Sequence, residues 1–167
     1  MPEVTKKIRE VARSLLQQKR VDLVIGFEQG TMPMRSTPCF VRGEKEVKRL
    51  VWDSFCENNL ATYLIRRPQR VAIIAKGCDV RTIVELIKEN QISRDQVVIV
   101  GIPCQGMVDR REVEAALQGK EILEVTEKDG QLMLRGGDFK ETLKRDTFLY
   151  PSCITCTHRN PVIYDVL

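Results

Sequence analysis

The stretch RVAIIAKGCDVRTIVELIKENQISRDQVVIVGIPC, residues 70–104, contains two apolar runs separated by an amphipathic segment. The runs at residues 70–77 and 96–103 are short and rich in Val, Ile and Ala, as expected of strands that are buried on both faces. Residues 78–92 place their apolar side chains at helical spacing, and Asp79 lies near the expected helix start. A strand, a helix and a strand in this order usually connect parallel neighbours. The stretch therefore predicts an α/β fold.

The rest of the chain extends this alternation on both sides. We expect an amphipathic helix at residues 4–20, a strand at 21–27 and a long helix at 47–67 that ends before Pro68. A short helix at 109–119 precedes two alternating segments that flank Asp129 and Gly130, which is a strong β-hairpin signal. Residues 138–149 are expected to form a last helix.

These elements predict one α/β domain over residues 1–167. Its fold class is a mostly parallel sheet with helices on both faces, a β-hairpin and a cysteine-bearing C-terminal tail. Residues 1–20 form the leading amphipathic helix of this domain. Residues 145–167 form its tail, which we expect to bind a cluster.

Composition excludes several function classes. The chain has 167 residues, 43% of them hydrophobic, and no apolar run approaches the roughly 20 residues needed to span a bilayer. Its N-terminus lacks the apolar core of a secretory signal, so the expected location is the cytoplasm. The net charge of +4 is dispersed and aromatic residues make up 5%, which gives no support for nucleic-acid binding.

The six cysteines are the first candidates for chemistry, because a reducing cytoplasm disfavours disulfides. Cys78 and Cys104 each follow a predicted strand directly, and parallel neighbours would bring both thiols to one edge of the sheet. Cys153 and Cys156 form a C-x-x-C pair in the tail. A tail that folds back would complete a tetrathiolate site for a 4Fe–4S cluster or a structural zinc. The split of one pair between two strand ends favours the cluster.

The other cysteines and the single histidine have plainer interpretations. Cys56 lies within the predicted long helix and is expected to be a packed core thiol. For Cys39 we favour burial over a place in a loop cavity. His158 is a ligand candidate only if the metal is zinc. A third hypothesis, a redox-active Cys153–Cys156 dithiol, ranks last because such motifs usually begin a helix after a strand.

The segment at residues 28–46, EQGTMPMRSTPCFVRGEKE, is too rich in Gly and Pro for a helix. We interpret it as a loop, with a short strand around CFVR, that faces the same edge as Cys78. Backbone or hydroxyl donors at Gly26, Gly30 and Thr37, with the guanidinium of Arg35, could hold a phosphate or an electron-deficient ring. An ordinary surface loop explains the segment about equally well.

The motifs KGCDVR, GIPCQG and CITCTHRNPVIYDV, taken in this order, carry a family resemblance. The sequence resembles the β-subunit family of deazaflavin (coenzyme factor 420) hydrogenases and dehydrogenases, including formate dehydrogenase β-like subunits. The resemblance covers roughly residues 20–167.

The resemblance implies an iron–sulfur flavoprotein module of an anaerobic redox complex, and thus an oxidoreductase subunit that passes electrons between a 4Fe–4S cluster and a flavin or partner subunit. The ligands carried over by motif are Cys78, Cys104, Cys153 and Cys156. FAD is the second cofactor implied, with Gly26, Gly30, Arg35, Thr37 and Lys76 as the candidate contacts. Implied partners are hydrogenase or dehydrogenase subunits and ferredoxin-like proteins. The alternative function is a zinc-stabilised interaction module without redox activity.

Overall fold

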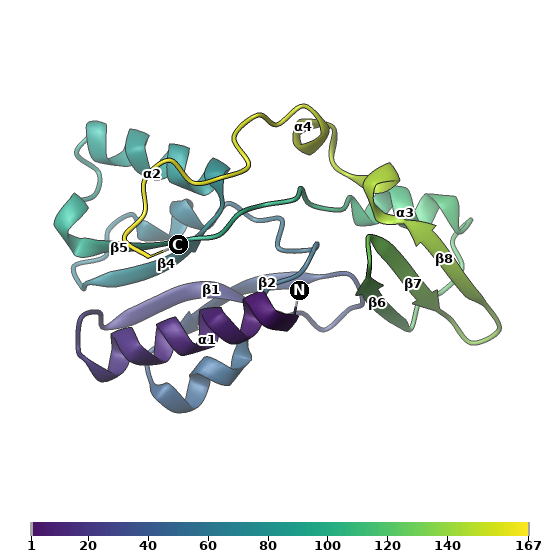
Figure 1. Cartoon of the computed structure of the whole chain (residues 1–167), viewed down its shortest axis with the longest axis horizontal. Helices are drawn as coiled ribbons and strands as arrows, with labels where there is room; N and C mark the ends of the chain where they lie inside the picture. Colours follow the sequence, from purple (N-terminus) through teal and green to yellow (C-terminus); the bar gives the residue numbers. More distant parts are fainter. Residues whose placement is uncertain (1, 167) are drawn as a thin grey trace.

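Residues 2–166, which this computed structural model describes, form two β-sheets (Figure 1). The larger sheet has the strand order β2-β1-β4-β5, with the short β3 also paired to β1. The central strands β1 (Leu23–Gln29), β4 (Val71–Ala75) and β5 (Val97–Gly101) run parallel. The strands β2 (Ser36–Val41) and β3 (Leu50–Val51) pair with β1 in the antiparallel sense. The predicted α/β fold class, with parallel strands at its centre, is confirmed.

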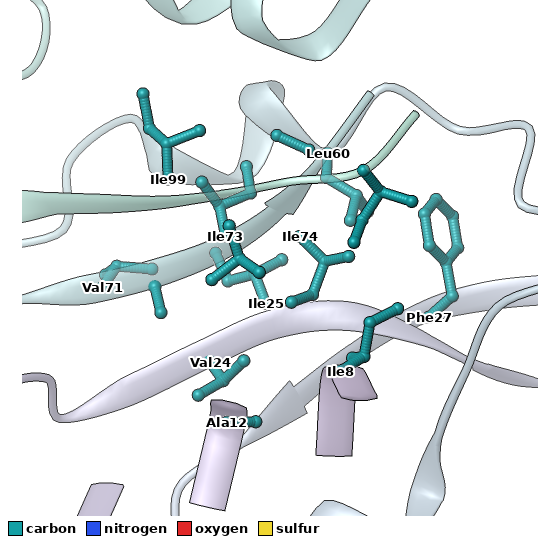
Figure 2. Packing of buried hydrophobic residues seen from close by; sticks show 14 of the residues in the cluster. Ile8, Ala12, Val24, Ile25, Phe27, Leu60, Val71, Ile73, Ile74 and Ile99 are labelled. Carbon is teal, nitrogen blue, oxygen red and sulfur yellow. The ribbon is translucent and has the colours of Figure 1, made fainter. Parts of the chain in front are cut away.

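Two helices pack against this sheet and lie on opposite sides of its strands in the view of Figure 1. Helix α1 (Pro2–Gln17) buries an apolar stripe that includes Ile8 and Ala12, and Figure 2 shows Ala12 beside Val24 of β1 and Ile8 towards Phe27. Helix α2 (Gly77–Lys88) connects β4 to β5 and buries Val80 and Ile83. The predicted strand–helix–strand unit is therefore present. No helix within the described residues has the length and apolarity needed to cross a membrane.

The smaller sheet is antiparallel and consists of β6 (Glu124–Lys128), β7 (Gln131–Arg135) and β8 (Lys140–Lys144). Asp129 and Gly130 connect β6 to β7, and both have positive φ, at 51° and 73°. This backbone suits a two-residue hairpin turn, as the Asp-Gly sequence predicts. One face of the sheet and helix α3 (Arg110–Ala116) share a second hydrophobic cluster with the chain around Leu149.

The predicted long helix at residues 47–67 is wrong. The segment instead contains the 3₁₀ helices η1 (Glu44–Arg49) and η2 (Leu60–Leu64), with β3 and a turn between them. Pairing of β3 with β1 extends the backbone, and the Asp53 carboxylate then fixes the turn by accepting hydrogen bonds from Ser36 Oγ and Phe55 N. Tertiary contacts therefore override a helical apolar spacing, as they often do.

The predicted last helix at residues 138–149 is also wrong. Residues 140–144 form β8, which pairs along its whole length with β7, and residues 145–148 form the 3₁₀ helix η4 (Arg145–Phe148). The free edge of β7 offers unpaired backbone groups, and KETLK satisfies them as a third strand. The segment at residues 28–46 is mostly ordered as well, because β2 pairs with β1 over six positions.

Truncation of a central core residue should measure the stability of this sheet. Ile73 of β4 is fully buried and lies between Ile25 and Ile99 in the parallel register. We expect Ile73→Ala to lower the free energy of unfolding by about 2–5 kcal/mol, because it leaves a cavity in a packed core. Urea denaturation measures this change. Leu123→Ala, at a side chain that is 55% exposed, should change the same free energy by less than about 0.5 kcal/mol.

Candidate functional site

A cavity of about 740 Å³ lies at the carboxyl ends of β4 and β5. Cys78 in the first turn of α2 and Cys104 in the loop after β5 line it. Cys153, in the short helix α4 (Pro151–Ile154), and Cys156, just after it, line the same cavity. The four cysteines that the sequence singles out therefore share one cavity.

The thiols line this cavity without forming a tight ligand cage. Within residues 2–166, no three or more His, Cys, Asp or Glu side chains are grouped closely enough to hold a metal ion. All four cysteines are free thiols. The donor set suits iron–sulfur or zinc chemistry in number and type, but the sulfur atoms must draw closer together to coordinate one centre.

The C-terminal tail folds back over the sheet edge, as the sequence predicts, and Figure 1 shows it passing from α4 over α2 towards β5. Gly101 N donates to Val166 O at 2.7 Å, and Val166 bridges Val100 in the parallel sense. Closer to the cavity, Cys104 N donates to Arg159 O at 2.8 Å. The tail is thus hydrogen-bonded to β5 and to the Cys104 loop, which holds the C-x-x-C pair near the strand ends.

Two glycines make this close approach possible. A Cβ atom added at Gly77 would lie 2.0 Å from His158 O, and one at Gly101 would lie 3.1 Å from Pro161 Cγ. Neither glycine has a positive φ, so the backbone conformation does not require glycine at either position. The tail packs directly on the backbone of Gly77 and leaves no room for a side chain there, whereas at Gly101 a Cβ would make a tight contact with the tail.

Backbone N–H groups point at two of the sulfur atoms. Gly106 N donates to Cys104 Sγ at 3.3 Å, and Met107 N donates to Cys153 Sγ at 3.4 Å. Such donors stabilise negative charge on sulfur. Desolvation raises the pKa of Cys104, and the Gly106 N–H opposes this rise. Desolvation, with the Asp79 carboxylate second, raises the pKa of Cys78 to about 11.

A buried arginine that sequence reasoning missed fixes the loop carrying these donors. Arg145 follows β8, is 3% exposed and forms an ion pair with Glu127 at 3.2 Å. Its Nε donates to Ser54 Oγ at 2.6 Å, and its other nitrogens donate to the carbonyls of Gln105 and Gly106. The smaller sheet thereby positions the backbone next to Cys104. No local signal marks this arginine, because the sequence predicts a helix where β8 forms.

The candidate flavin contacts are not gathered at the cysteine cavity. Gly26 packs in β1 against Leu50, and Gly30 N donates to Arg35 O at 2.7 Å to close the β1–β2 turn. Neither they nor Thr37 line the cysteine cavity, whereas Lys76 does. The loop is therefore a hairpin turn. Because β1 runs parallel to β4, this turn lies at the same edge of the sheet as Cys78, as predicted, but it does not line the cysteine cavity.

The remaining sequence candidates lie as follows. Cys39 and Cys56 are fully buried in the main core, so both burial predictions are confirmed, although Cys56 lies in a turn instead of a helix. Desolvation raises the pKa of both thiols. His158 is exposed and lines the cavity from the tail.

The geometry defines an α/β protein with a thiol-lined cavity at the carboxyl edge of its parallel strands. Residues 68–166 match the sequence model of a family described as the C terminus of the beta subunit of coenzyme F420 hydrogenase/dehydrogenase. The chain belongs to this family, as the motifs predict.

Similar curated proteins agree with this assignment. The chain is 31% identical over 99 residues to the F420-dependent formate dehydrogenase subunit beta of Methanocaldococcus jannaschii. It is 30% identical over 97 residues to the F420-dependent formate dehydrogenase 1 subunit beta of Methanococcus maripaludis. Each match covers 56% of this chain but only 26% and 25% of the relatives. The chain thus spans about a quarter of the length of the curated relatives it matches.

A solved structure shares the fold. A chain of the F420-reducing [NiFe] hydrogenase complex from Methanosarcina barkeri, studied by xenon derivatization, superposes with a TM-score of 0.65 at 14% identity. The superposition covers 93% of this chain and 62% of that chain. The fold likeness therefore extends well beyond the residues that the family model matches.

A side chain at Gly77 should displace the tail. We expect Gly77→Ala to lower the free energy of unfolding by roughly 1–3 kcal/mol, because the new Cβ overlaps the His158 carbonyl. Hydrogen exchange should also show faster exchange at Cys104 N, whose acceptor is Arg159 O. Gly43→Ala is the matched control, since its Cβ meets no atom within 4 Å. Equal stability and exchange in both variants would contradict the close approach.

Proposed function

We propose that this chain is an iron–sulfur subunit or module of an anaerobic redox complex, acting in the cytoplasm. Cys78, Cys104, Cys153 and Cys156 would hold one 4Fe–4S cluster. The observation that carries the proposal is that thiols from three separate segments line one cavity at the carboxyl edge of the sheet. Membership of a hydrogenase and dehydrogenase β-subunit family supports a redox role.

The surroundings of the cavity suit such a centre. When bound, a 4Fe–4S cluster supplies one-electron transfer. The chain would hold it on two rigid points, the N-terminal turn of α2 and the loop after β5, and on a tail bonded to both the loop and β5. The two N–H···S contacts would stabilise the sulfur charge. Coordination requires only that the cavity contract around the four thiols.

The acceptor is proposed to be a flavin or a partner subunit that approaches the open side of the cavity. The separation of Gly26, Gly30, Arg35 and Thr37 from the cysteines gives no support for FAD contacts in the β1–β2 turn. We therefore infer that any FAD serving this cluster contacts other residues, including those of other subunits of the complex.

The same proposal includes the domain organisation. Residues 1–167 would form a single domain, and the tail at 145–167 would be its cluster-binding segment.

A structural zinc is the second candidate, and one observation favours it. His158 lines the same cavity as the four cysteines, so the tail offers both sulfur and imidazole ligands there. Zinc would stabilise the tail without any redox role. Metal analysis of protein purified without oxygen separates the two candidates directly.

Iron and acid-labile sulfide should be stoichiometric after anaerobic purification or reconstitution. We expect about four of each per chain, with an EPR signal after reduction by dithionite. Cys78→Ser, Cys104→Ser, Cys153→Ser and Cys156→Ser should each abolish or degrade the cluster. Fewer than about one iron per chain, or stoichiometric zinc in its place, would overturn the iron–sulfur assignment.

Cys56→Ser is the matched control for these variants. Cys56 is buried in the core, where its sulfur lies 3.4 Å from Asp53 N and 3.5 Å from Asp53 Oδ1. A serine hydroxyl can make the same contacts, so iron content should stay at the level of the unmodified protein. Loss of iron in folded Cys56→Ser, equal to that in Cys104→Ser, would mean that the four ligands were wrongly chosen.

A further inference from the structure

Lys76 differs from every other charged side chain that lines the cysteine cavity. It is 2% exposed, whereas the other Glu, Arg and His side chains that line the cavity in residues 2–166 are exposed or half-buried: Glu57, Arg81, His158 and Arg159. Water screens charges at such positions, but screens a buried charge much less. Arg145 is also buried, but Glu127 and Asp146 pair with it and it does not line this cavity.

The ammonium group of Lys76 has no donor left for a ligand. Its Nζ donates to Asn58 O at 2.8 Å and to Cys56 O at 3.0 Å, and it pairs with Asp79 Oδ2 at 3.2 Å. A lysine ammonium has three N–H donors, and these three acceptors use them all. The Phe27 ring, 4.8 Å from Nζ, adds a further favourable contact. The side chain is thus held rigidly as a fixed positive charge.

The positive charge of Lys76 borders the cavity more closely than the negative charge of its partner, Asp79. Lys76 lines the cavity and Asp79 does not. The Asp79 carboxylate is fully buried and accepts hydrogen bonds from Leu60 N at 3.1 Å and Lys76 N at 2.8 Å. These backbone donors compensate part of its negative charge.

We propose that the fixed positive charge of Lys76 raises the reduction potential of the centre bound in this cavity. In this proposal Lys76 does not contact a flavin. The proposal rests on the proposed iron–sulfur function. One-electron reduction adds one unit of negative charge within the cavity, and a nearby fixed cation stabilises that charge. The electron comes from the external reductant, and no proton or bond change at Lys76 is required.

Coulomb's law sets the scale. Two unit charges about 10 Å apart, at an effective dielectric constant of about 20, alter an equilibrium roughly tenfold. Loss of the Lys76 charge should therefore lower the ratio of reduced to oxidised centre about tenfold at a fixed solution potential. For a one-electron couple this corresponds to a shift of about 59 mV to more negative potential.

A potentiometric titration with dithionite, followed by EPR of the full reconstituted chain, tests the proposal. We expect Lys76→Met to shift the midpoint to more negative potential and Lys76→Arg to stay within about twofold of the unmodified ratio. Lys88→Met is the matched control, because Lys88 lies exposed at the other end of α2 and pairs there with Glu85. Its midpoint should not move.

The possible outcomes distinguish the role of Lys76 from the iron–sulfur assignment. Lys76→Met with full iron and an unshifted midpoint overturns the role of Lys76 and leaves the iron–sulfur assignment intact. An unmodified chain that takes up no iron overturns both. Because Lys76→Met leaves Asp79 buried without its partner, Lys76→Met/Asp79→Asn provides a neutral pair, and we expect a smaller shift of the same sign. If neither variant retains iron while Cys56→Ser does, Lys76 is a structural residue and the potential-tuning role is withdrawn.

Discussion

The parallel pairing of β4 with β5 is the constraint on which the site depends. Five consecutive residue pairs, from Val71–Val97 to Ala75–Gly101, align the two strands so that both end at the same level. Cys78 and Cys104 follow these ends at similar distances and so reach the same edge of the sheet. Had the strands been antiparallel, the two thiols would lie at opposite edges and no tail could join them.

The tail turns this edge into a cavity, and its attachment is made of backbone contacts. Hydrogen bonds from β5 and from the Cys104 loop reach the segment at residues 159–166, and Asp165 reinforces them by accepting from Ile99 N and pairing with Arg94. Gly77 and Gly101 supply the space. The chain thus assembles four thiols from segments that are far apart in sequence, at the edge where α/β proteins generally bind ligands.

The smaller sheet stabilises the loop that follows Cys104. Through Arg145 it holds the carbonyls of Gln105 and Gly106, and the same loop presents N–H groups to Cys104 and Cys153. Lys76 binds the carbonyls of Cys56 and Asn58, and Asn58 lines the cavity. Both cations therefore order backbone segments at the cavity wall.

Sequence reasoning succeeded where local pattern and tertiary structure agree. The strands at residues 71–75 and 97–101 are apolar on both faces and could be placed directly, and with them Cys78 and Cys104. It failed at residues 47–67 and 138–149, where helical spacing of apolar residues is satisfied by core contacts and by sheet pairing with β1 and β7. The role of Arg145 could not be predicted for the same reason, because it depends on β8 being a strand.

The most direct test of the central claim is a crystal structure of the anaerobically reconstituted chain with the anomalous signal of iron. The account predicts one four-iron centre in the cavity, ligated by the sulfur atoms of Cys78, Cys104, Cys153 and Cys156, with the tail still bonded to β5. Iron bound elsewhere, or a single zinc ion ligated by His158 together with cysteines, would contradict it.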